Sequence, residues 1–366
     1  MPDLPQAAPQ VQPLSPRAQV IKAPAQRNVG AGSLAAQVRQ RKKDDTPAWL
    51  DWLASTLAIG IIRLLTLLPY RWRVPVGGWI MASVAGPIAG YSLRIRNNLN
   101  LIFPDMPEDE KRKLNRAVRE KIGRSFAEMF SPGEIKAIAA ETPISGPGLK
   151  AAEAAREAGR PVIFVSGHIG NYDVGRAILI QQGHKVGALY RRMNYAKFNT
   201  FYVRHLSAIG TPLFERGRKG TIQMINHLRA GNAIAILLDQ HMRAGAWLRF
   251  FGRRARTALS AGDLALKYDA LVVPCYAIRQ PDGFSFEMIV EEPIPHSTAE
   301  EMTQALNDSL EAQVRAHMDQ WFWVHKRWKV RRKRISPAKQ EKMRMKAERK
   351  KRKAARRAAQ SAPRDL

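Results

Sequence analysis

Residues 161–173 read PVIFVSGHIGNYD, and this short stretch decides the fold class. The run PVIFV is continuously apolar, which is typical of a strand buried on both faces. Ser-Gly-His follows it, and the next segment, NYDVGRAILIQQ, has the pattern of a helix that begins after Asn171. In open α/β sheets, ligands bind beyond the carboxyl ends of the strands. We therefore expect His168 to lie at the ligand-binding edge of a sheet.

The same alternation of strand and helix continues through the rest of this half of the chain. Further apolar runs are KVGALY, TPLFE, AIAILL and ALVVPCYAI, separated by helical patterns such as TIQMINHLRAG and ALSAGDLALKYD. This rhythm predicts an α/β fold with a mostly parallel sheet flanked by helices. The turn signal QPDG before FSFEMIV predicts a late antiparallel hairpin. A helix is expected from about Thr298 to His317, and an earlier amphipathic helix over residues 105–130.

The chain divides by composition into four parts. Residues 1–45 form a Pro- and Ala-rich arm that we expect to be disordered. We expect residues 46–145 to form a hydrophobic, membrane-associated segment with N-terminal helices, and residues 146–330 to form a catalytic α/β domain. Residues 331–366 form a basic tail that is either disordered or helical.

Residues 52–68, WLASTLAIGIIRLLTLL, are apolar except for one central arginine. A spanning helix needs about 20 such residues, and a central arginine costs roughly 2.5–3.5 kcal/mol on insertion scales. Three interpretations stay open: a short tilted span, a helix lying in the membrane interface, and a buried core helix. Nearby tryptophans and arginines resemble the anchors found at membrane interfaces, which favours membrane association.

The net charge of +29 on 366 residues points to an anionic partner. About half of the excess lies between Lys326 and Arg357. A nucleic acid would satisfy the charge, but the aromatic residues lie in apolar runs and no reading motif is present, so none is expected. The single cysteine, Cys275, excludes an internal disulfide and is expected in the core. A metal site is not expected, because no second histidine or carboxylate cluster stands near His168 at ligand spacing.

The His-x4-Asp spacing of His168 and Asp173 carries little information alone, because His296 and Glu301 share it. The second pair lies in PIPHSTAEEM, where helix capping by Ser297 or Thr298 explains the pattern. For His168, contact with Asp173 requires the histidine outside the helix and the aspartate in its first turn. The carboxylate would then fix the imidazole tautomer. The alternative is that His168 only caps the helix or binds backbone.

Several blocks in order resemble one family. GHIGNYD resembles the signature of the lipid A biosynthesis acyltransferases (the lauroyl and myristoyl transferases), a branch of the lysophospholipid acyltransferase superfamily with a glycerolipid acyltransferase-like fold. RNNLNLIFPDMPEDEKRKL, RSFAEMF, LRAGNAIAILLDQ, LRFFGRRARTALSAG and QWFWVHKRWK resemble further blocks of the same family. The likeness runs from about residue 57 to residue 329.

The resemblance implies roles for individual residues. His168 matches the general base and Asp173 its paired acid, although this family more often has Glu there and Trp in place of Tyr172. Arg218, or else Arg216, matches an arginine that would meet a phosphate or developing negative charge. Asp239 and Gln240 match the family's Asp-Gln pair, with an implied role in substrate binding.

The resemblance also implies an activity and a location. The chain is expected to move a fatty acyl chain from an acyl carrier protein thioester to a hydroxyl of a lipid A precursor, without a cofactor. The expected location is the cytoplasmic face of the bacterial inner membrane, with an anionic membrane surface as a further partner. The alternatives are a related membrane acyltransferase with another glycolipid or lysophospholipid acceptor, and a basic non-enzymatic membrane or nucleic-acid-binding protein. Phe250 and Phe251 could line an acyl groove or pack in the core. Trp321, Trp323 and Trp328 could form a surface at headgroup level or pack against the domain.

Overall fold

The computed structural model describes residues 47–329 and the single residues 341 and 345. The expected N-terminal arm and nearly all of the expected basic tail lie outside the described residues. From Trp52 onward the described residues belong to one compact unit. The division of that unit at residue 145 stays a prediction.

A seven-stranded sheet forms the centre of this unit, with the strand order β1-β9-β8-β2-β5-β3-β4. All neighbouring strands are parallel except β8 and β9, which pair antiparallel as the QPDG hairpin predicted. The strands are β1 (Ile144–Ser145), β2 (Val162–Ser166), β3 (Val186–Tyr190), β4 (Leu213–Glu215), β5 (Ala233–Leu237), β8 (Leu271–Arg279) and β9 (Phe286–Val290). The predicted mostly parallel α/β fold is confirmed.

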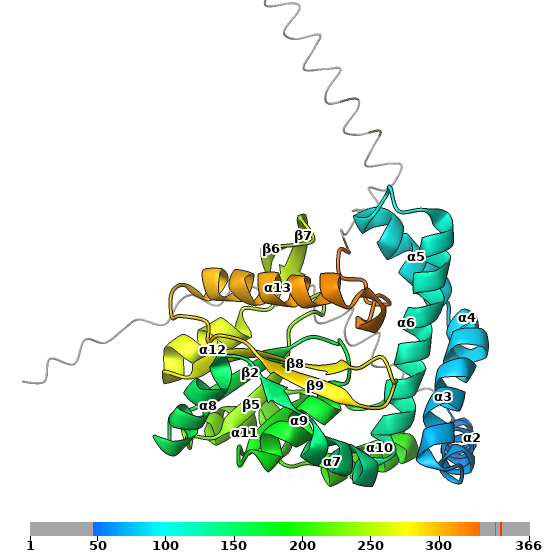
Figure 1. Ribbon diagram of the computed structural model, residues 1–366, viewed down its shortest axis with the longest axis horizontal. Helices are drawn as coiled ribbons and strands as arrows, with labels where there is room; N and C mark the ends of the chain where they lie inside the picture. Colours follow the sequence, from blue (N-terminus) through cyan, green and yellow to red (C-terminus); the bar gives the residue numbers. More distant parts are fainter. Residues whose placement is uncertain (1–46, 330–340, 342–344, 346–366) are drawn as a thin grey trace, which may run out of the picture. The chain divides into compact units, whose positions relative to one another are not determined.

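Helices cover both faces of the sheet (Figure 1). One face is packed by α7 (Pro132–Glu141), α8 (Gly148–Glu157), α9 (Tyr172–Gln181) and α10 (Ala196–Ile209). The other is packed by α11 (Arg218–Arg229), α12 (Ser260–Tyr268) and α13 (Ala299–Ala316). Side chains of β2 alternate between the two cores, with Phe164 on the first side and Ile163 and Val165 on the second. Both faces of β2 are therefore buried, which explains why its apolar run is continuous.

A two-stranded antiparallel sheet stands apart from the main one. It consists of β6 (Ala246–Phe250) and β7 (Arg253–Thr257). Phe250 and Phe251 beside it are buried, and they pack with Trp321, Trp323 and Trp328 in a third core. Of the two expectations for these aromatic side chains, core packing is therefore the one that the structure shows. The expectation of a surface at headgroup level is wrong for the three tryptophans, which follow η2 (Met318–Gln320), because their side chains are buried in this core.

Three N-terminal elements pack along α6 (Glu108–Met129): α3 (Tyr70–Ile80), the π-helical turn η1 (Met81–Ala85) and α5 (Tyr91–Ile102). The short α4 (Gly86–Ile88) packs against η1 and α5, and α2 (Ala48–Thr66) precedes α3 in the chain. Glycines let α3 and α6 approach closely, since a Cβ on Gly123 would lie 2.3 Å from the carbonyl oxygen of Gly77. The amphipathic helix expected at residues 105–130 is thus confirmed, and it joins this layer to the sheet.

The α2 helix carries apolar side chains on two sides. Ile59 and Ile62 are buried, whereas Leu57, Ile61 and Leu64 are about 60% or more exposed on a stripe with helical spacing. Among the described residues, its window Trp49–Thr66 is the one stretch that is long and apolar enough to cross a membrane, by length and composition alone. The interpretation as a fully buried core helix is therefore wrong. A span and an interfacial helix both remain.

Candidate active site

Strand register brings His168 and Asp239 together. Ser166 and Leu237, the last residues of β2 and β5, pair directly. His168 and Asp239 each follow two residues after the end of their strand. Because parallel strands end at the same edge, both side chains emerge there side by side. The Asp239 carboxylate Oδ1 lies 2.7 Å from Nδ1 of His168, and its Oδ2 accepts the backbone N–H of His168 at 2.8 Å.

The Asp239 carboxylate is completely buried and accepts a third hydrogen bond, from Nε1 of Trp321 at 2.9 Å. Burial alone would raise the pKa of this carboxyl. Attraction to His168, the hydrogen bonds from it and the nearby His325 overcome that effect and hold the pKa well below its usual range. Asp239 is therefore an anion that can only accept hydrogen bonds, so Nδ1 of His168 must carry a proton.

In the neutral imidazole, this arrangement leaves Nε2 of His168 as the hydrogen-bond acceptor. The imidazole is 18% exposed, and the amide nitrogen of Gln240 lies 3.4 Å from Nε2. The expected neighbourhood of His168, Asp239 and Gln240 is therefore present. A neutral imidazole with a lone pair at the sheet edge can accept a proton from a hydroxyl group, and the buried anion behind it stabilises the imidazolium that forms.

Asp173 does not make the contact with His168 that its spacing suggested. It lies in the first turn of α9, as expected, where its backbone N–H donates to Oδ1 of the cap residue Asn171 at 3.0 Å. However, its carboxylate makes no hydrogen bond or ion pair with any residue that the structure describes. The reason is that α9 packs against the face of the sheet, whereas the imidazole turns toward β5. Burial raises the pKa of Asp173, while Arg176 and His168 partly offset the effect.

The Asp173 carboxylate faces a cavity of about 90 Å³ between the sheet and α9 and α10. The walls are mostly apolar, with Phe164, Leu179, Leu206 and Met288 among them. Ser166 and Leu237, the strand ends directly before the His168–Asp239 pair, also line it. An apolar space thus begins beneath the polar pair at the sheet edge.

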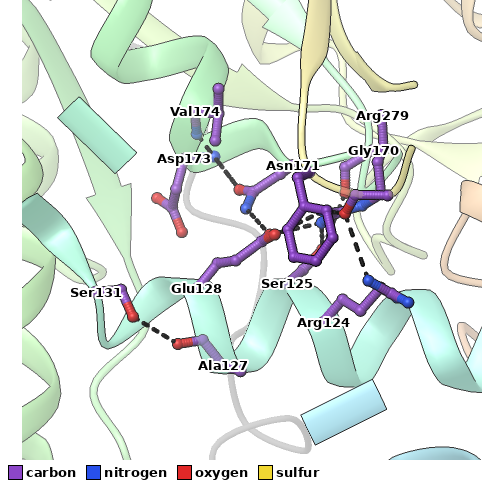
Figure 2. A network of polar contacts seen from close by, with 12 residues as sticks. Arg124, Ser125, Ala127, Glu128, Ser131, Gly170, Asn171, Asp173, Val174 and Arg279 are labelled. Carbon is purple, nitrogen blue, oxygen red and sulfur yellow. Dashed lines mark hydrogen bonds and ion pairs between the residues drawn. The ribbon is translucent and has the colours of Figure 1, made fainter. Parts of the chain in front are cut away.

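A buried polar network fixes the turn after His168 (Figure 2). Glu128 of α6 forms a two-pronged ion pair with Arg279 at the end of β8, at 2.6 and 2.5 Å, and both side chains are almost fully buried. The same carboxylate accepts a hydrogen bond from the side-chain amide of Asn171 at 2.8 Å. The hydroxyl of Ser125 donates to the carbonyl of Gly170 at 3.2 Å. Two ordered elements therefore hold the turn that carries the histidine.

Gly170 in this turn has φ of +57°, and a Cβ there would lie 1.9 Å from the carbonyl oxygen of Ala277. Only glycine fits both the left-handed conformation and this close approach. The turn is also hydrogen-bonded to the C-terminal segment, since the N–H of Phe322 donates to the carbonyl of His168 at 2.9 Å.

A second histidine, His325, stands against the pair. Its Nε2 is 3.9 Å from Oδ2 of Asp239, and its ring meets the His168 ring at 4.7 Å between centroids. Burial lowers the pKa of His325 to about 4, despite the attraction of Asp239, so its imidazole is neutral near pH 7. The expectation that no second histidine lies near His168 is thus wrong, because the fold brings in a residue far along the chain.

Potential ligand atoms of His168, Asp239 and His325 all lie within 4.8 Å of one another. The 2.7 Å separation of Nδ1 and Oδ1 is that of a charge-assisted hydrogen bond. With the two bonds that Oδ2 accepts, from the backbone of His168 and from Trp321, three of the roughly four acceptor positions of the carboxylate are in use.

The two candidate arginines stand at the rim of this edge. Arg216 and Arg218 are exposed, at the end of β4 and the start of α11. Nη2 of Arg216 lies 3.8 Å from the sulfur of Met242, two residues beyond Gln240. Their role in binding substrate stays a prediction. Nε2 of His296 donates to the carbonyl of Ala270 at 2.9 Å, and Thr298 and Glu301 form the expected capping box.

The sequence matches the pattern of the bacterial lipid A biosynthesis acyltransferase family over residues 38–330. The chain belongs to this family. It is 24% identical to the lipid A biosynthesis lauroyltransferase of Escherichia coli K12 over 77% of this chain and 92% of that protein. It is 26% identical to the myristoyltransferase of the same strain, over 77% and 88%. The predicted family is thus confirmed.

Relatives with another acceptor are equally similar. Identity to the phosphatidylinositol mannoside acyltransferase of Mycobacterium tuberculosis H37Rv is 24%, over 73% of this chain and 85% of that protein. Among solved structures, the 1-acyl-sn-glycerophosphate acyltransferase PlsC of Thermotoga maritima aligns with 69% of this chain and 99% of its own, at 14% identity and a TM-score of 0.31. The chain is therefore an acyltransferase of the lipid A family, and its acceptor is a separate question.

Proposed function

We propose that the protein transfers a fatty acyl chain from an acyl carrier protein thioester to a hydroxyl group of a lipid A precursor. The observation that carries this proposal is the His168–Asp239 pair, with Nε2 of the imidazole open at the sheet edge above an apolar cavity. Membership of the lipid A family supports the choice of acceptor.

In the proposed reaction, Nε2 of His168 removes the proton from the acceptor hydroxyl as its oxygen attacks the thioester carbonyl. A tetrahedral oxyanion forms, and the amide of Gln240, 3.4 Å from Nε2, is placed to donate a hydrogen bond to it. The intermediate then collapses, the C–S bond breaks, and the imidazolium returns its proton to the leaving thiolate. No cofactor takes part in these steps. General-base catalysis of this kind contributes about 10²–10⁴-fold.

The remaining parts receive roles that fit their positions. The cavity beneath the pair would hold part of the acyl chain, since its walls are apolar. Arg216 and Arg218 at the rim would meet a phosphate of the acceptor. The exposed stripe of α2, with Trp72 and Trp79 of α3 nearby in sequence, would bury itself in the cytoplasmic face of the inner membrane.

The test compares two histidines with the same spacing to an acid. Purified full-length protein is incubated with an acyl carrier protein thioester and an acylated glucosamine disaccharide, and the products are measured by mass spectrometry. His168→Ala is expected to reduce transfer by about 10²–10⁴-fold. His296→Ala should leave it unchanged, because that residue precedes a capping box. Full transfer by His168→Ala would refute the mechanism.

A second acceptor is favoured by one specific finding, the equal similarity to phosphatidylinositol mannoside acyltransferase. The same assay with a mannosylated phosphatidylinositol acceptor distinguishes the two. Mass spectrometry of lipids from a deletion strain gives an independent answer. Lipid A that lacks one secondary acyl chain supports the proposal, and intact lipid A with an altered glycolipid overturns it.

A further inference from the structure

A cationic cleft lies between α5 and α6. Of the residues described at the candidate active site, these two helices carry only Ser125 and Glu128. Its volume is about 480 Å³. Five of its nine lining residues are basic and one is acidic: Arg96, Lys111, Arg112, Arg116 and Arg119, with Glu108. On α6 these residues recur at intervals of three and four, so one face of the helix supplies them. A hollow with this net positive charge is suited to an anion.

Two of the five cations are already committed inside the protein. Lys111 is buried, pairs with Glu108 at 3.1 Å and donates to the carbonyl of Pro104. Arg119 donates through Nε to Asn115 and through Nη1 to the carbonyl of Ala82. These bonds shape the wall of the cleft.

The other three, Arg96, Arg112 and Arg116, are exposed and form no ion pair with any described residue. Arg112 and Arg116 lie four residues apart on α6, a spacing at which like charges on a helix repel each other. Planar guanidinium groups bind phosphate oxygens through paired hydrogen bonds. The uncompensated charge would be neutralised by such a group.

The cleft is a built feature and has an apolar side. The Asn115 amide donates to the carbonyl of Ser92 at 2.7 Å and so ties α6 to α5. Leu93, which also lines the cleft, is 53% exposed, and Ile88, just before α5, is 84% exposed. Charged walls beside exposed apolar side chains match a ligand with a charged head and an apolar body.

We propose that this cleft binds the phosphate group of an anionic membrane lipid. A free phosphate would share the polar chemistry but would leave Leu93 and Ile88 in water, so the apolar side favours the lipid. The site would fix how α5 and α6 meet the bilayer surface. The proposal is independent of the acyl transfer reaction, so either can fail without the other.

The experiment measures binding of the full-length protein to vesicles of phosphatidylcholine, with and without phosphatidylglycerol. Salt of about 0.5 M shortens the screening length to roughly 4 Å and suppresses diffuse attraction. Replacing Arg96, Arg112 and Arg116 by Ala is expected to weaken binding to anionic vesicles roughly a hundredfold, about fivefold for each arginine. The same three positions changed to Lys keep the charge but lose the paired hydrogen bonds, and should bind about tenfold more weakly than the wild type.

The matched control replaces Lys150, Lys185 and Arg229, which are exposed and form no ion pair within the described part of the chain. It removes equal charge and should bind like the wild type. Equal binding by the Lys variant and the wild type would show diffuse attraction and overturn the proposal. The proposal would also be overturned if inorganic phosphate competed fully for the three arginines while the Ala substitutions left vesicle binding unchanged. The cleft would then bind a free anion and not a lipid.

Discussion

Replacing Asp239 by Asn should remove the catalytic base without removing the histidine. The carboxylate accepts three hydrogen bonds, two at Oδ2 from the backbone of His168 and from Trp321, and one at Oδ1 from Nδ1. An asparagine can keep the first two with its carbonyl oxygen. Its amide group then faces Nδ1 and donates to it, so the imidazole must carry its proton on Nε2 instead.

In that tautomer the nitrogen that faces the substrate has no free lone pair. We expect kcat to fall by about 10²–10⁴-fold, which is about 3–5 kcal/mol of activation free energy. KM should change little, because Asp239 is buried behind the imidazole. Two of three hydrogen bonds survive, so the loss of folding stability should be about 1–2 kcal/mol.

Asp173→Asn is the matched comparison, because the sequence motif alone would make it the damaging change. Its carboxylate makes no hydrogen bond, and burial raises its pKa, so the charged form destabilises the native state. Native stability due to this group therefore falls as the pH rises through the native pKa. The Asn variant should keep near-normal transfer and be more stable than the wild type at pH 7. Single-turnover transfer and chemical unfolding measure both. An inactive Asp173→Asn beside an active Asp239→Asn would refute the reasoning.

Three further outcomes follow from contacts around the pair. Asn171→Ser keeps a helix cap but loses the hydrogen bond to Glu128, so acyl transfer should fall about tenfold and about 1 kcal/mol of stability should be lost. Asn171→Asp should lose more of both, because its carboxylate would then meet that of Glu128. Activity assays and chemical unfolding measure the two effects. Gly170→Ala should give little folded protein by circular dichroism, because its Cβ would overlap the carbonyl of Ala277. Gly252→Ala has a similar left-handed φ of +67° but open space around it, so it should fold with only about 1–2 kcal/mol of stability lost. The pKa of His325 is about 4 in the native state and about 6.5 when unfolded, so the free energy of unfolding falls by about 3 kcal/mol as the pH drops from 6.5 to 4. In unfolding titrations, His325→Gln should lose this part of the pH dependence. An unchanged slope of stability against pH in that variant would contradict the prediction.

The architecture could be predicted because its signals are local. Each of the five apolar runs between residues 161 and 279 forms a strand, since a strand buried on both faces needs no polar alternation. The β6–β7 ribbon was missed, because the segment LRFFGRRART mixes arginines with aromatics and neither strand is a continuous apolar run. The two-residue strand β1 is too short to leave a pattern.

The site could be predicted only in part, because its key contacts join distant residues. The sequence identifies His168 and Asp239 separately, but their contact depends on β2 pairing with β5 in one register. Glu128 and Arg279 are 151 residues apart, and nothing local marks them as partners. The spacing places Asp173 in the right turn, but the direction of its carboxylate depends on the face against which α9 packs. A segment of tryptophans and basic residues has the same composition whether its tryptophans contact lipid or pack in a core, so their burial could not be predicted from the sequence.

The hydrogen bonds between the histidine turn and residues 320–322 set the order in which the enzyme can be completed on the ribosome. Gly170 donates to the carbonyl of Gln320, Phe322 donates to that of His168, and Trp321 supplies the third donor to Asp239. These groups are among the last of the described chain to be synthesised, whereas the apolar helices α2 and α3 emerge first. A nascent chain thus exposes the apolar stripe of α2 about 250 residues before residues 320–322 can fix the turn of its base, so the His168–Asp239 pair is completed only late in synthesis.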